Sequence, residues 1–541
     1  MAENRTKKGP SSPRRGAAAG KAAPAGEPPK AAFPFRCAAV DVGSNAIRLM
    51  AVEFTAPGGF APLFQERIPI RLGHEVFLTG KLSREAMDGA VQALKAFSRT
   101  VEGLKATHVR AVTTSAVREA SNGAEFTERI RKEAKFDLEV ISGYEEARLI
   151  HLAVRHRIPM GSQEWLLADL GGGSVEVSLA DGSGILWSES HTMGAVRLLE
   201  EISGGREEPG RFLDLLEEYT STLRVPASAT SGRRLGFIAT GGNVEALAQL
   251  AGVRPGPHGV SVLPLDSLRQ LIEKLAGLSY RQRVTTLGLK EDRADVILPA
   301  AIVYERLGLL VGASAIHVPH VGLKEGLLLD LAESLTARQV HEDAQDRQVL
   351  AGAVALGRRY FFDEAHGRHV AELAASLFDQ LSELHGMGPQ EKRLLCAAAV
   401  LHDLGSYISF KGHHKHSAYV VANSELPGFS PQEMLQTAAV ARYHRKGSPK
   451  LRHDEYALLD RGERRTVEAL AALLRLADAL DREHRQTVRS AWVRVRDGAA
   501  ELTLEGEGEM LLERWALKRK ADLFGRVYGV EVHVTPGGGR K

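Results

Sequence analysis

The spacing of apolar residues changes partway along the chain. Up to about residue 335, short apolar runs bounded by glycine and polar residues alternate with amphipathic helical segments, which is the pattern of an α/β fold. Beyond this point strand patterns give way to long helical ones, such as the stripe from Val370 to Leu381. Short strand patterns return after Val488. We therefore expect an α/β part, a helical part and a small α/β segment at the C-terminus.

Composition adds one further region at the N-terminus. The first residues are rich in Ala, Pro, Gly, Lys and Arg with almost no large apolar side chains, which predicts a disordered basic tail. The expected regions are the tail at 1–34, a first lobe at 35–164, a second lobe at 165–335, a helical domain at 336–487 and a small α/β domain at 488–541.

One glycine-rich turn carries the most specific chemical signal. The segment Asp169-Leu-Gly-Gly-Gly-Ser-Val-Glu176 lies between two apolar runs and therefore predicts strand, turn, strand with a carboxylate on either side of the turn. Consecutive glycines let backbone N–H groups point at an anion, and the carboxylates can hold a divalent cation against that anion. An ordinary glycine hairpin is the alternative interpretation of this segment alone.

A second copy of this turn occurs earlier in the chain. When Asp41-Val-Gly-Ser-Asn45 is aligned with the turn that begins at Asp169, Asp41 falls on Asp169 and the flanking apolar residues are also in register. Two such units predict two related lobes that face each other across a cleft. The copies differ where the first has Arg48 and the second has Glu176, so we expect the metal and the reacting water on the second turn's side.

Other candidates lie at predicted helix starts. Gly241 and Gly242 join a strand to a helix, a common seat for phosphate. Arg118 follows another strand and can be carried towards an anion. Of two adjacent glutamates, Glu145 has capping-box spacing from Ser142, whereas Glu146 has no such role and is free to point into the cleft.

Composition and motifs also exclude several classes. The formal net charge of +3 indicates no overall electrostatic partner, and hence no specific nucleic acid. The two cysteines support neither a disulfide framework nor a cysteine-rich metal site, and no run has the length of a membrane helix or of a signal peptide. We expect a soluble, cytoplasmic protein without a membrane partner. A Walker lysine motif and a G-x-G-x-x-G fingerprint are missing from these turns, which excludes P-loop hydrolases and dehydrogenases.

The motifs in order resemble the exopolyphosphatase/guanosine pentaphosphate phosphohydrolase (Ppx/GppA) family of the actin-like ATPase superfamily. The residues that carry this resemblance are Asp41-Val-Gly-Ser-Asn45, Thr114-Ser-Ala-Val-Arg118-Glu-Ala, Ile141-Ser-Gly-Tyr-Glu-Glu146-Ala-Arg-Leu-Ile150, Asp169-Leu-Gly-Gly-Gly-Ser-Val-Glu176, Met193-Gly-Ala-Val-Arg197 and Thr240-Gly-Gly-Asn243. One departure is visible, because Val175 stands where the family commonly has Thr.

The resemblance implies two actin-like, ribonuclease H-like lobes and a processive, Mg²⁺-dependent hydrolase that removes terminal phosphate from inorganic polyphosphate. It implies that Glu146 is the catalytic base, that Arg118 holds a phosphate, and that Asp169 and Glu176 support the metal and the water. The residues expected to cradle the phosphate chain are Asp41, Gly43, Ser44, Asn45, Gly171, Gly172, Gly173, Ser174, Gly241 and Gly242.

The helical part resembles an HD-type domain, which commonly follows the phosphatase lobes in this family. The residues that fit its spaced pattern, and would meet one divalent transition metal, are His366, His402, Asp403 and Asp478. His416 and His444 are candidates for a second metal. A degenerate fold kept for dimerisation or for lengthening the substrate channel is the alternative.

Three other functions stay open at this point. The motifs do not separate polyphosphate from guanosine pentaphosphate as substrate. A non-catalytic sensor of polyphosphate or guanosine tetraphosphate is a different class, but a pure polyanion site gains nothing from the carboxylate of Glu146. A phosphotransferase of the same superfamily uses similar turns. The resemblance also implies a homodimer built through the helical domain.

Overall fold

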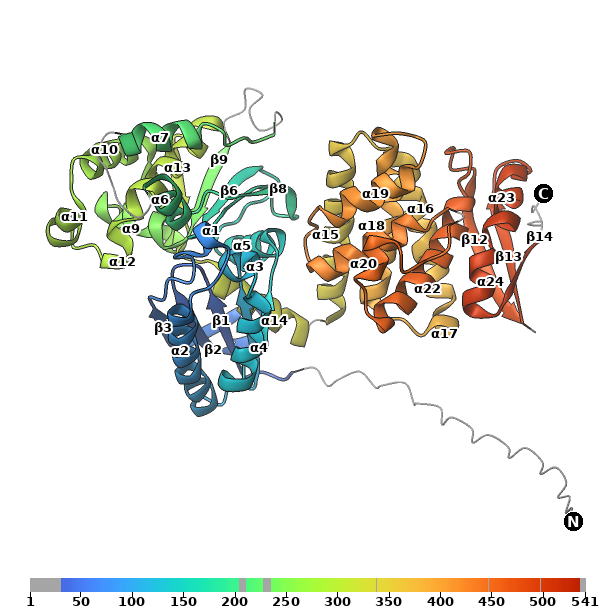
Figure 1. Ribbon diagram of the computed structural model, residues 1–541, viewed down its shortest axis with the longest axis horizontal. Coiled ribbons are helices and arrows are strands. Elements are labelled where there is room, and N and C mark those ends of the chain that lie inside the picture. The colour runs from blue at the N-terminus through green and yellow to red at the C-terminus, as the bar shows by residue number, and fades with distance from the viewer. Residues whose placement is uncertain are drawn as a thin grey trace, which may run out of the picture.

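The structure is a computed structural model that describes residues 31–203, 211–226, 235–336, 338–445, 447–496 and 498–535. The expected tail therefore lies outside the described residues except for its last four positions. Two α/β lobes lie one against the other, and the helical part lies beside them (Figure 1). The fold class expected from the sequence is confirmed.

The first lobe is built on a five-stranded sheet in the order β3-β2-β1-β4-β5. Its central strand is an apolar run whose side chains are buried, and it pairs antiparallel with β2 and parallel with β4. The strands are β1 (Phe35–Val42), β2 (Ile47–Ala56), β3 (Gly59–Ile68), β4 (His108–Thr113) and β5 (Leu138–Val140), and the helices are α1 (Val76–Thr79), α2 (Arg84–Gly103), α3 (Ser115–Glu119), α4 (Gly123–Ala134) and α5 (Gly143–Arg157).

The second lobe repeats this topology. Its sheet order is β10-β11-β9-β6-β7-β8, so β8-β7-β6-β9-β11 corresponds to the five strands of the first lobe, with the same parallel and antiparallel pairings. The strands are β6 (Trp165–Leu170), β7 (Val175–Ala180), β8 (Ile185–His191), β9 (Gly236–Thr240), β10 (Ser261–Pro264) and β11 (Ala315–Val318). The helices are α6 (Ala195–Ser203), α7 (Arg211–Thr220), α9 (Gly242–Leu250), η1 (Pro257–Gly259), α10 (Leu265–Ala276), α11 (Tyr280–Leu287), α12 (Glu291–Ala294) and α13 (Ile297–Leu310). Helix α14 (Leu323–Thr336) follows β11 in the chain but packs against β1 and β2 of the first lobe. This order confirms the internal repeat predicted from the two turns.

A shared core joins the two lobes. Buried residues of both sheets, such as Val52 and Leu167, form one apolar cluster with Leu149 of α5 and Leu327 of α14. Helices α5 and α14 pack closely because Gly326 has no side chain: a Cβ there would lie 2.0 Å from the carbonyl oxygen of Leu149. The start of α5, which carries Glu146, is therefore held by both lobes.

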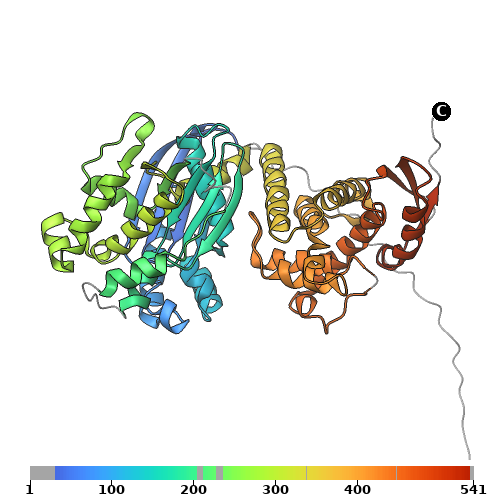
Figure 2. The ribbon, with the colours of Figure 1, turned by 90° about the horizontal axis from the view of Figure 1, so that it is seen from above.

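Helix α15 (Arg338–Arg359) leads into the helical part, as Figure 2 shows from above. The elements that follow are α16 (Glu364–Gln380), α17 (Ser382–His385), α18 (Pro389–Leu401), η2 (Leu404–Tyr407), α19 (His413–Ala422), α20 (Pro431–Arg442), α21 (Asp454–Ala457), α22 (Arg461–Ala479), β12 (Val488–Arg496), β13 (Ala499–Gly506), α23 (Leu511–Lys520), α24 (Asp522–Tyr528) and β14 (Glu531–Thr535). The C-terminal strands and helices share one apolar core with the preceding helices, through residues such as Leu502 and Phe524. None of the described helices is long and apolar enough to cross a membrane.

We expect Gly326→Ala to lower the stability of the lobes by about 2 kcal/mol, because the added methyl group overlaps the backbone of α5 and forces the two helices apart. Urea unfolding followed by tryptophan fluorescence measures the loss. Gly103→Ala is the matched control, since a Cβ at that helical position meets nothing within 4 Å. Equal unfolding midpoints for the two variants would contradict the close packing.

Candidate functional site

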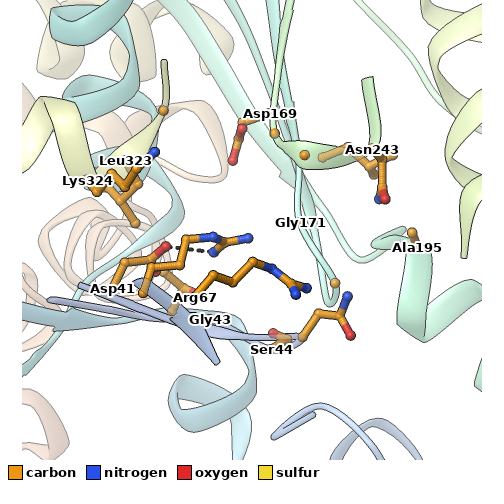
Figure 3. Close-up of a pocket in the computed structure, with 18 of the residues that line it drawn as sticks. Asp41, Gly43, Ser44, Arg67, Asp169, Gly171, Ala195, Asn243, Leu323 and Lys324 are labelled. Carbon is orange, nitrogen blue, oxygen red and sulfur yellow. Dashed lines mark hydrogen bonds and ion pairs between the residues drawn. The ribbon is translucent and has the colours of Figure 1, made fainter. Parts of the chain in front are cut away.

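The glycine turns of the two lobes face each other across a cavity of about 220 Å³ (Figure 3). The first turn follows β1, the second joins β6 to β7, and the third joins β9 to α9. The turn residues that line the cavity are Gly43, Ser44, Asn45, Gly171, Gly172, Ser174, Gly241, Gly242 and Asn243. The structure thus brings together residues from all three turns that the sequence singled out.

The close approach of the turns explains why glycine occupies them. The N–H of Gly171 donates to the carbonyl of Ser174 at 3.0 Å, and that of Gly43 donates to Ala46 at 3.1 Å, so the two copies have the same turn. A Cβ at Gly172 would lie 3.0 Å from the Cβ of Ser44 in the other lobe. A side chain at Gly172 would therefore push the two turns apart.

Gly173 differs from the other predicted turn residues because it does not line the cavity. A Cβ at this position would lie 2.4 Å from the ring of Phe77 and 2.5 Å from the hydroxyl of Ser115. Its carbonyl accepts a hydrogen bond from Nε of Arg197 at 2.7 Å. Gly173 therefore packs the turn against its neighbours rather than facing a ligand.

Three carboxylates gather beside the second turn. Ligand oxygens of Glu146, Asp169 and Glu176 all lie within 4.8 Å of one another. One oxygen of Glu176 accepts hydrogen bonds from the hydroxyls of Ser174 at 2.6 Å and Ser190 at 3.0 Å. The Oε2 atoms of Glu146 and Glu176 are buried and have no hydrogen-bond partner among the described residues. Buried acidic oxygens without donors indicate that something else neutralises them.

The ionisation of these acids depends on their burial and proximity. Burial and the neighbouring Glu176 carboxylate hold the pKa of Glu146 well above its usual range. Burial raises the pKa of Glu176 to about 7, and it also raises the pKa of Asp169. All three acids therefore favour a bound cation. Because each offers oxygen atoms, the set fits Mg²⁺.

This arrangement makes the effect of Mg²⁺ depend on pH. Without metal, a carboxyl group whose pKa is higher in the folded than in the unfolded protein makes its full contribution to stability at pH values below the unfolded pKa of 4.5. This contribution is lost as the pH rises towards the folded pKa of about 7. We expect the Mg²⁺-induced rise in the unfolding midpoint to be larger at pH 8 than at pH 5, as thermal unfolding with EDTA or Mg²⁺ measures. Glu176→Gln should reduce the difference. A Mg²⁺ effect that is the same at both pH values would contradict this ionisation.

The corresponding position in the first lobe is neutralised within the chain. In the strand registers Asp41 lies opposite Arg48, whereas Asp169 lies opposite Glu176. Nη1 of Arg48 donates to Asp41 at 2.8 Å. The strand pair beside the second turn, where we expect the metal, therefore has a second acid at the position where the first lobe has an arginine.

Sequence reasoning missed the cations that complete the cavity wall, Arg67, Arg293 and Lys324. Arg67 comes from β3 and contacts Asp292 of the opposite lobe. Nearby, Arg71 donates two hydrogen bonds to Asp295 at 2.7 and 2.9 Å. No pattern in the sequence identifies these residues, because their position depends on how the two lobes pack.

Arg118 lies beside the carboxylates rather than in the cavity wall. It is in the last turn of α3, and its Nη1 donates to the carbonyl of Ile141 at 2.8 Å. Its charge nevertheless acts on Glu146 and Glu176, since it lowers the pKa of both against the effect of burial. Contact with a phosphate would require its guanidinium to use its remaining N–H groups.

Glu145 has a larger structural role than the predicted helix cap. Its N–H donates to the hydroxyl of Ser142 at 3.2 Å, as capping requires. Its carboxylate instead accepts two hydrogen bonds from Arg148, at 2.7 and 2.8 Å, and Arg148 also donates to Asp330 of α14 at 2.7 Å. Arg110 contacts both acids as well. This buried ion cluster ties the first turn of α5 to α14.

In the helical part, the candidate ligands fall into three overlapping groups, each with ligand atoms within 4.8 Å of one another. His366, His402 and Asp478 form one. Asp403 forms another with His366 and His484, and a third with His413 and His444. His416 was expected there, but it lies one turn further along α19 with its Cβ beside Gly405. His413 is thus the residue of this segment that joins the group.

In His366, His402, His413 and His444, the Nδ1 atom lies beside a hydrogen-bond acceptor. The Nδ1 atoms of His402 and His444 each lie 2.7 Å from the backbone carbonyl oxygen three residues earlier. That of His413 lies 3.0 Å from the carbonyl of Phe410, and that of His366 lies 2.8 Å from Asp481. Since Nδ1 must then carry the proton, the inward Nε2 atoms present lone pairs, which is how metal-binding histidines are oriented.

Comparisons with known proteins identify the family of this chain. Profiles of the Ppx/GppA phosphatase family and of Ppx/GppA phosphatase domain III match residues 52–335 and 350–523. An exopolyphosphatase structure from Cytophaga hutchinsonii is 30% identical, with a TM-score of 0.52, over 55% of this chain and 98% of that chain. A Ppx/GppA family member from Aquifex aeolicus is 25% identical, with a TM-score of 0.47, over 55% of this chain and 96% of that chain.

Proposed function

Because this chain belongs to the Ppx/GppA phosphatase family, a family of phosphoanhydride hydrolases, we propose that it is an exopolyphosphatase. It hydrolyses the terminal phosphoanhydride bond of inorganic polyphosphate, with Mg²⁺, and releases orthophosphate. The similarity to the Cytophaga hutchinsonii exopolyphosphatase supports polyphosphate as the substrate. The alternative within the family is removal of the 5′ γ-phosphate of guanosine pentaphosphate.

One observation carries the proposal: Glu146 is a buried carboxylate with an unpartnered oxygen beside two further acids and the glycine turns. A site that only bound polyanions would be weakened by this charge. A hydrolase needs it, because a water molecule must be oriented and deprotonated as it attacks. The geometry therefore supports catalysis over sensing.

In the proposed reaction, Glu146 accepts a proton from water while the water oxygen bonds to the terminal phosphorus. The P–O bond to the bridging oxygen breaks, and this oxygen remains with the shortened chain. Asp169 and Glu176 would hold Mg²⁺, which neutralises charge on the phosphoryl oxygens when bound. The hydroxyls of Ser174 and Ser190 keep the Glu176 carboxylate oriented. Arg118 adds positive charge on the same side of the cleft.

The rest of the chain would lie along the glycine turns. N–H groups at Gly172 and Gly242 can donate to phosphate oxygens, as turns and helix starts do in phosphate sites. Arg67 and Lys324 supply charge across the cavity. The cavity is lined by residues of both lobes, so the phosphate chain would be held between them.

Phosphate release from long-chain polyphosphate and from guanosine pentaphosphate, each with Mg²⁺ or with EDTA, tests the proposal. We expect release from polyphosphate that EDTA abolishes. Release from guanosine pentaphosphate alone would establish the alternative activity. Binding of polyphosphate without release from either substrate would establish a sensor.

We also propose that a divalent transition metal binds in the helical part between His366, His402 and Asp478. The Nε2 atoms of the two histidines face each other at 3.2 Å, although both are acceptors once Nδ1 carries the proton. Two lone pairs at this distance repel, and either a proton on one of the two nitrogens or a metal ion between them and the carboxylate removes this repulsion. Mixed nitrogen and oxygen ligands are typical of such metals.

A further inference from the structure

A second cavity lies where the helical part meets the two lobes. It has a volume of about 290 Å³, and we call it the junction cavity. Its walls come from α5 and α14, from the β7–β8 turn and β8 of the second lobe, and from α15. Figure 1 shows α15 between the lobes and the rest of the helical part. The junction cavity shares no lining residue with the cavity between the glycine turns, so it is a separate place for a ligand.

Helix α15 approaches the lobes without filling this space. Near its C-terminal end, Nη2 of Arg359 donates to the backbone carbonyl of Ser188 in β8 at 3.0 Å. Earlier in the helix, Ala344 and Ala351 line the junction cavity, and their methyl groups are too short to fill it. The contact at one end and the short side chains further along leave a cavity between parts of the chain, where ligand sites commonly occur.

The walls of the junction cavity carry positive charge without partners. Arg155 of α5 and Arg347 of α15 both line it and are exposed to solvent, and neither has a hydrogen bond or ion pair with any residue that the structure describes. Glu333 is the acid among the described lining residues, and it already takes part in another interaction. Burial lowers the pKa of His151 in the same wall, and the charges of Arg155 and Arg148 lower it further. An anion can therefore reach two free guanidinium groups.

A buried donor adds to this set. Gln348 follows Arg347 in α15 and also lines the junction cavity. Its Nε2 is buried and has no hydrogen-bond partner within the described part of the chain. Since buried amide N–H groups are normally paired, this one favours a ligand that brings an acceptor. Two guanidinium groups and an amide offer donors only, which suits a ligand rich in anionic oxygen atoms.

We propose that the junction cavity is a binding site for a diphosphate group. A guanidinium group can donate two parallel hydrogen bonds to one phosphoryl group, so Arg155 and Arg347 can each hold one of two linked phosphoryl groups. The amide of Gln348 donates to an oxygen of the same ligand. Free diphosphate and the diphosphate of a nucleotide offer the same chemistry to these residues.

The position of the site connects it to the cleft. The ligand would join α15 to α5, the helix whose first turn carries Glu146. Arg148 lines the junction cavity and donates to the carboxylate of Glu145 at 2.7 and 2.8 Å, so one side chain reaches from the site to that first turn. A ligand that holds α5 and α15 together should restrict their movement and slow each turnover. This regulatory role rests on the proposed function, whereas binding does not.

Counting bound ligands gives the first test, because the cleft also attracts phosphate. The full chain in EDTA is titrated by calorimetry with methylenediphosphonate, a diphosphate analogue that cannot be hydrolysed. We expect Arg347→Gln and Arg155→Gln each to bind one ligand fewer per chain than the wild type. Arg358→Gln is the matched control on α15, since its guanidinium already pairs with Glu364 at 2.7 Å. Equal numbers of ligands in Arg347→Gln and Arg358→Gln would overturn the site.

Two further ligands identify the chemistry. Malonate places two carboxylates on the same CH₂ group, and we expect it to bind about 10-fold more weakly than methylenediphosphonate because each carboxylate has less charge and fewer oxygen atoms. Equal affinity for malonate would overturn the assignment to phosphate. Adenosine diphosphate distinguishes the two sources: tighter binding that depends on Arg347 assigns a nucleotide, and equal or weaker binding assigns free diphosphate.

The regulatory role is tested on polyphosphate hydrolysis with free Mg²⁺ held constant. Methylenediphosphonate should lower kcat by at least 2-fold in the wild type and in Arg358→Gln, and should leave kcat unchanged in Arg347→Gln. A rise in KM alone, equal in all three proteins, would assign the effect to the cleft and overturn regulation through the junction cavity. A wild type that releases no phosphate would contradict the proposed function, and the ligand count would still decide whether the site exists.

Discussion

Glu146→Gln should lower kcat for phosphate release from polyphosphate by about 1,000-fold, within the range of about 10²–10⁴ for loss of a general base. The substitution keeps the size of the side chain but removes its ability to accept a proton from water. KM should stay within about 2-fold, because the cavity surface and the neighbouring turns are unchanged. Initial rates of phosphate release over a range of polyphosphate concentrations measure both constants.

Glu189→Gln is the matched control for this prediction. Glu189 is an exposed carboxylate on β8 next to Ser190, so its loss removes a similar charge from the same neighbourhood without touching the cavity. A wild-type kcat in Glu146→Gln would show that another group deprotonates the water. An equal loss in both variants would show that overall charge, rather than a base, controls the rate.

Arg148→Met should destabilise the lobes by about 3 kcal/mol, because it leaves the buried carboxylates of Glu145 and Asp330 without their main partner. Methionine fills a similar volume, so the loss comes from uncompensated charge rather than from a cavity. Arg110 still contacts both acids, and we therefore expect the lower part of the range of about 3–5 kcal/mol for broken buried ion pairs. Urea unfolding of the two proteins measures the difference.

Arg129→Met is the comparison for an exposed pair. Arg129 contacts Asp88 and Glu133 at the surface, where water screens the charges and the loss should be much smaller than in Arg148→Met. A similar small loss in Arg148→Met would mean that the buried cluster contributes no more than surface charge does. Because the cluster anchors the first turn of α5, a large loss should also reduce polyphosphate hydrolysis in the folded variant.

The sequence was sufficient for the parts of the site that follow from local rules. The two Asp-x-Gly turns align in sequence, and the structure gives them matching strand registers. Glu146 stood out because Glu145 already had a local role, and the structure places Glu146 at the cavity. Both arguments depend on residues that are close in the chain, where geometry is determined by turns and helix caps.

The parts that could not be predicted depend on helix phase and on long-range packing. The polar run from His413 to His416 contains no apolar stripe, so nothing in it shows which histidine faces inward. That is decided by Gly412, whose φ of +81° starts α19 at the next residue. Arg67 reaches the cavity only because the two lobes meet.

The C-terminal segment shows the same limit. Its strands and helices were expected from their apolar pattern, but as a separate appendage. Val488 and Phe524 instead belong to the core of the preceding helices, and Lys520 contacts Asp478. An apolar face indicates that a segment packs against something and does not indicate against what.

The exchange of Arg48 in one strand pair for Glu176 in the other gives the cleft a polarity. On one side Asp41 is neutralised by Arg48, and on the other Asp169 lies opposite the acidic Glu176. The two ends of a linear polyphosphate chain are chemically identical, so the substrate itself carries no direction. Under the proposed function, the asymmetry between the two turns determines in which part of the cleft the terminal phosphate is cleaved. It thereby also determines the direction in which the shortened polyphosphate chain advances.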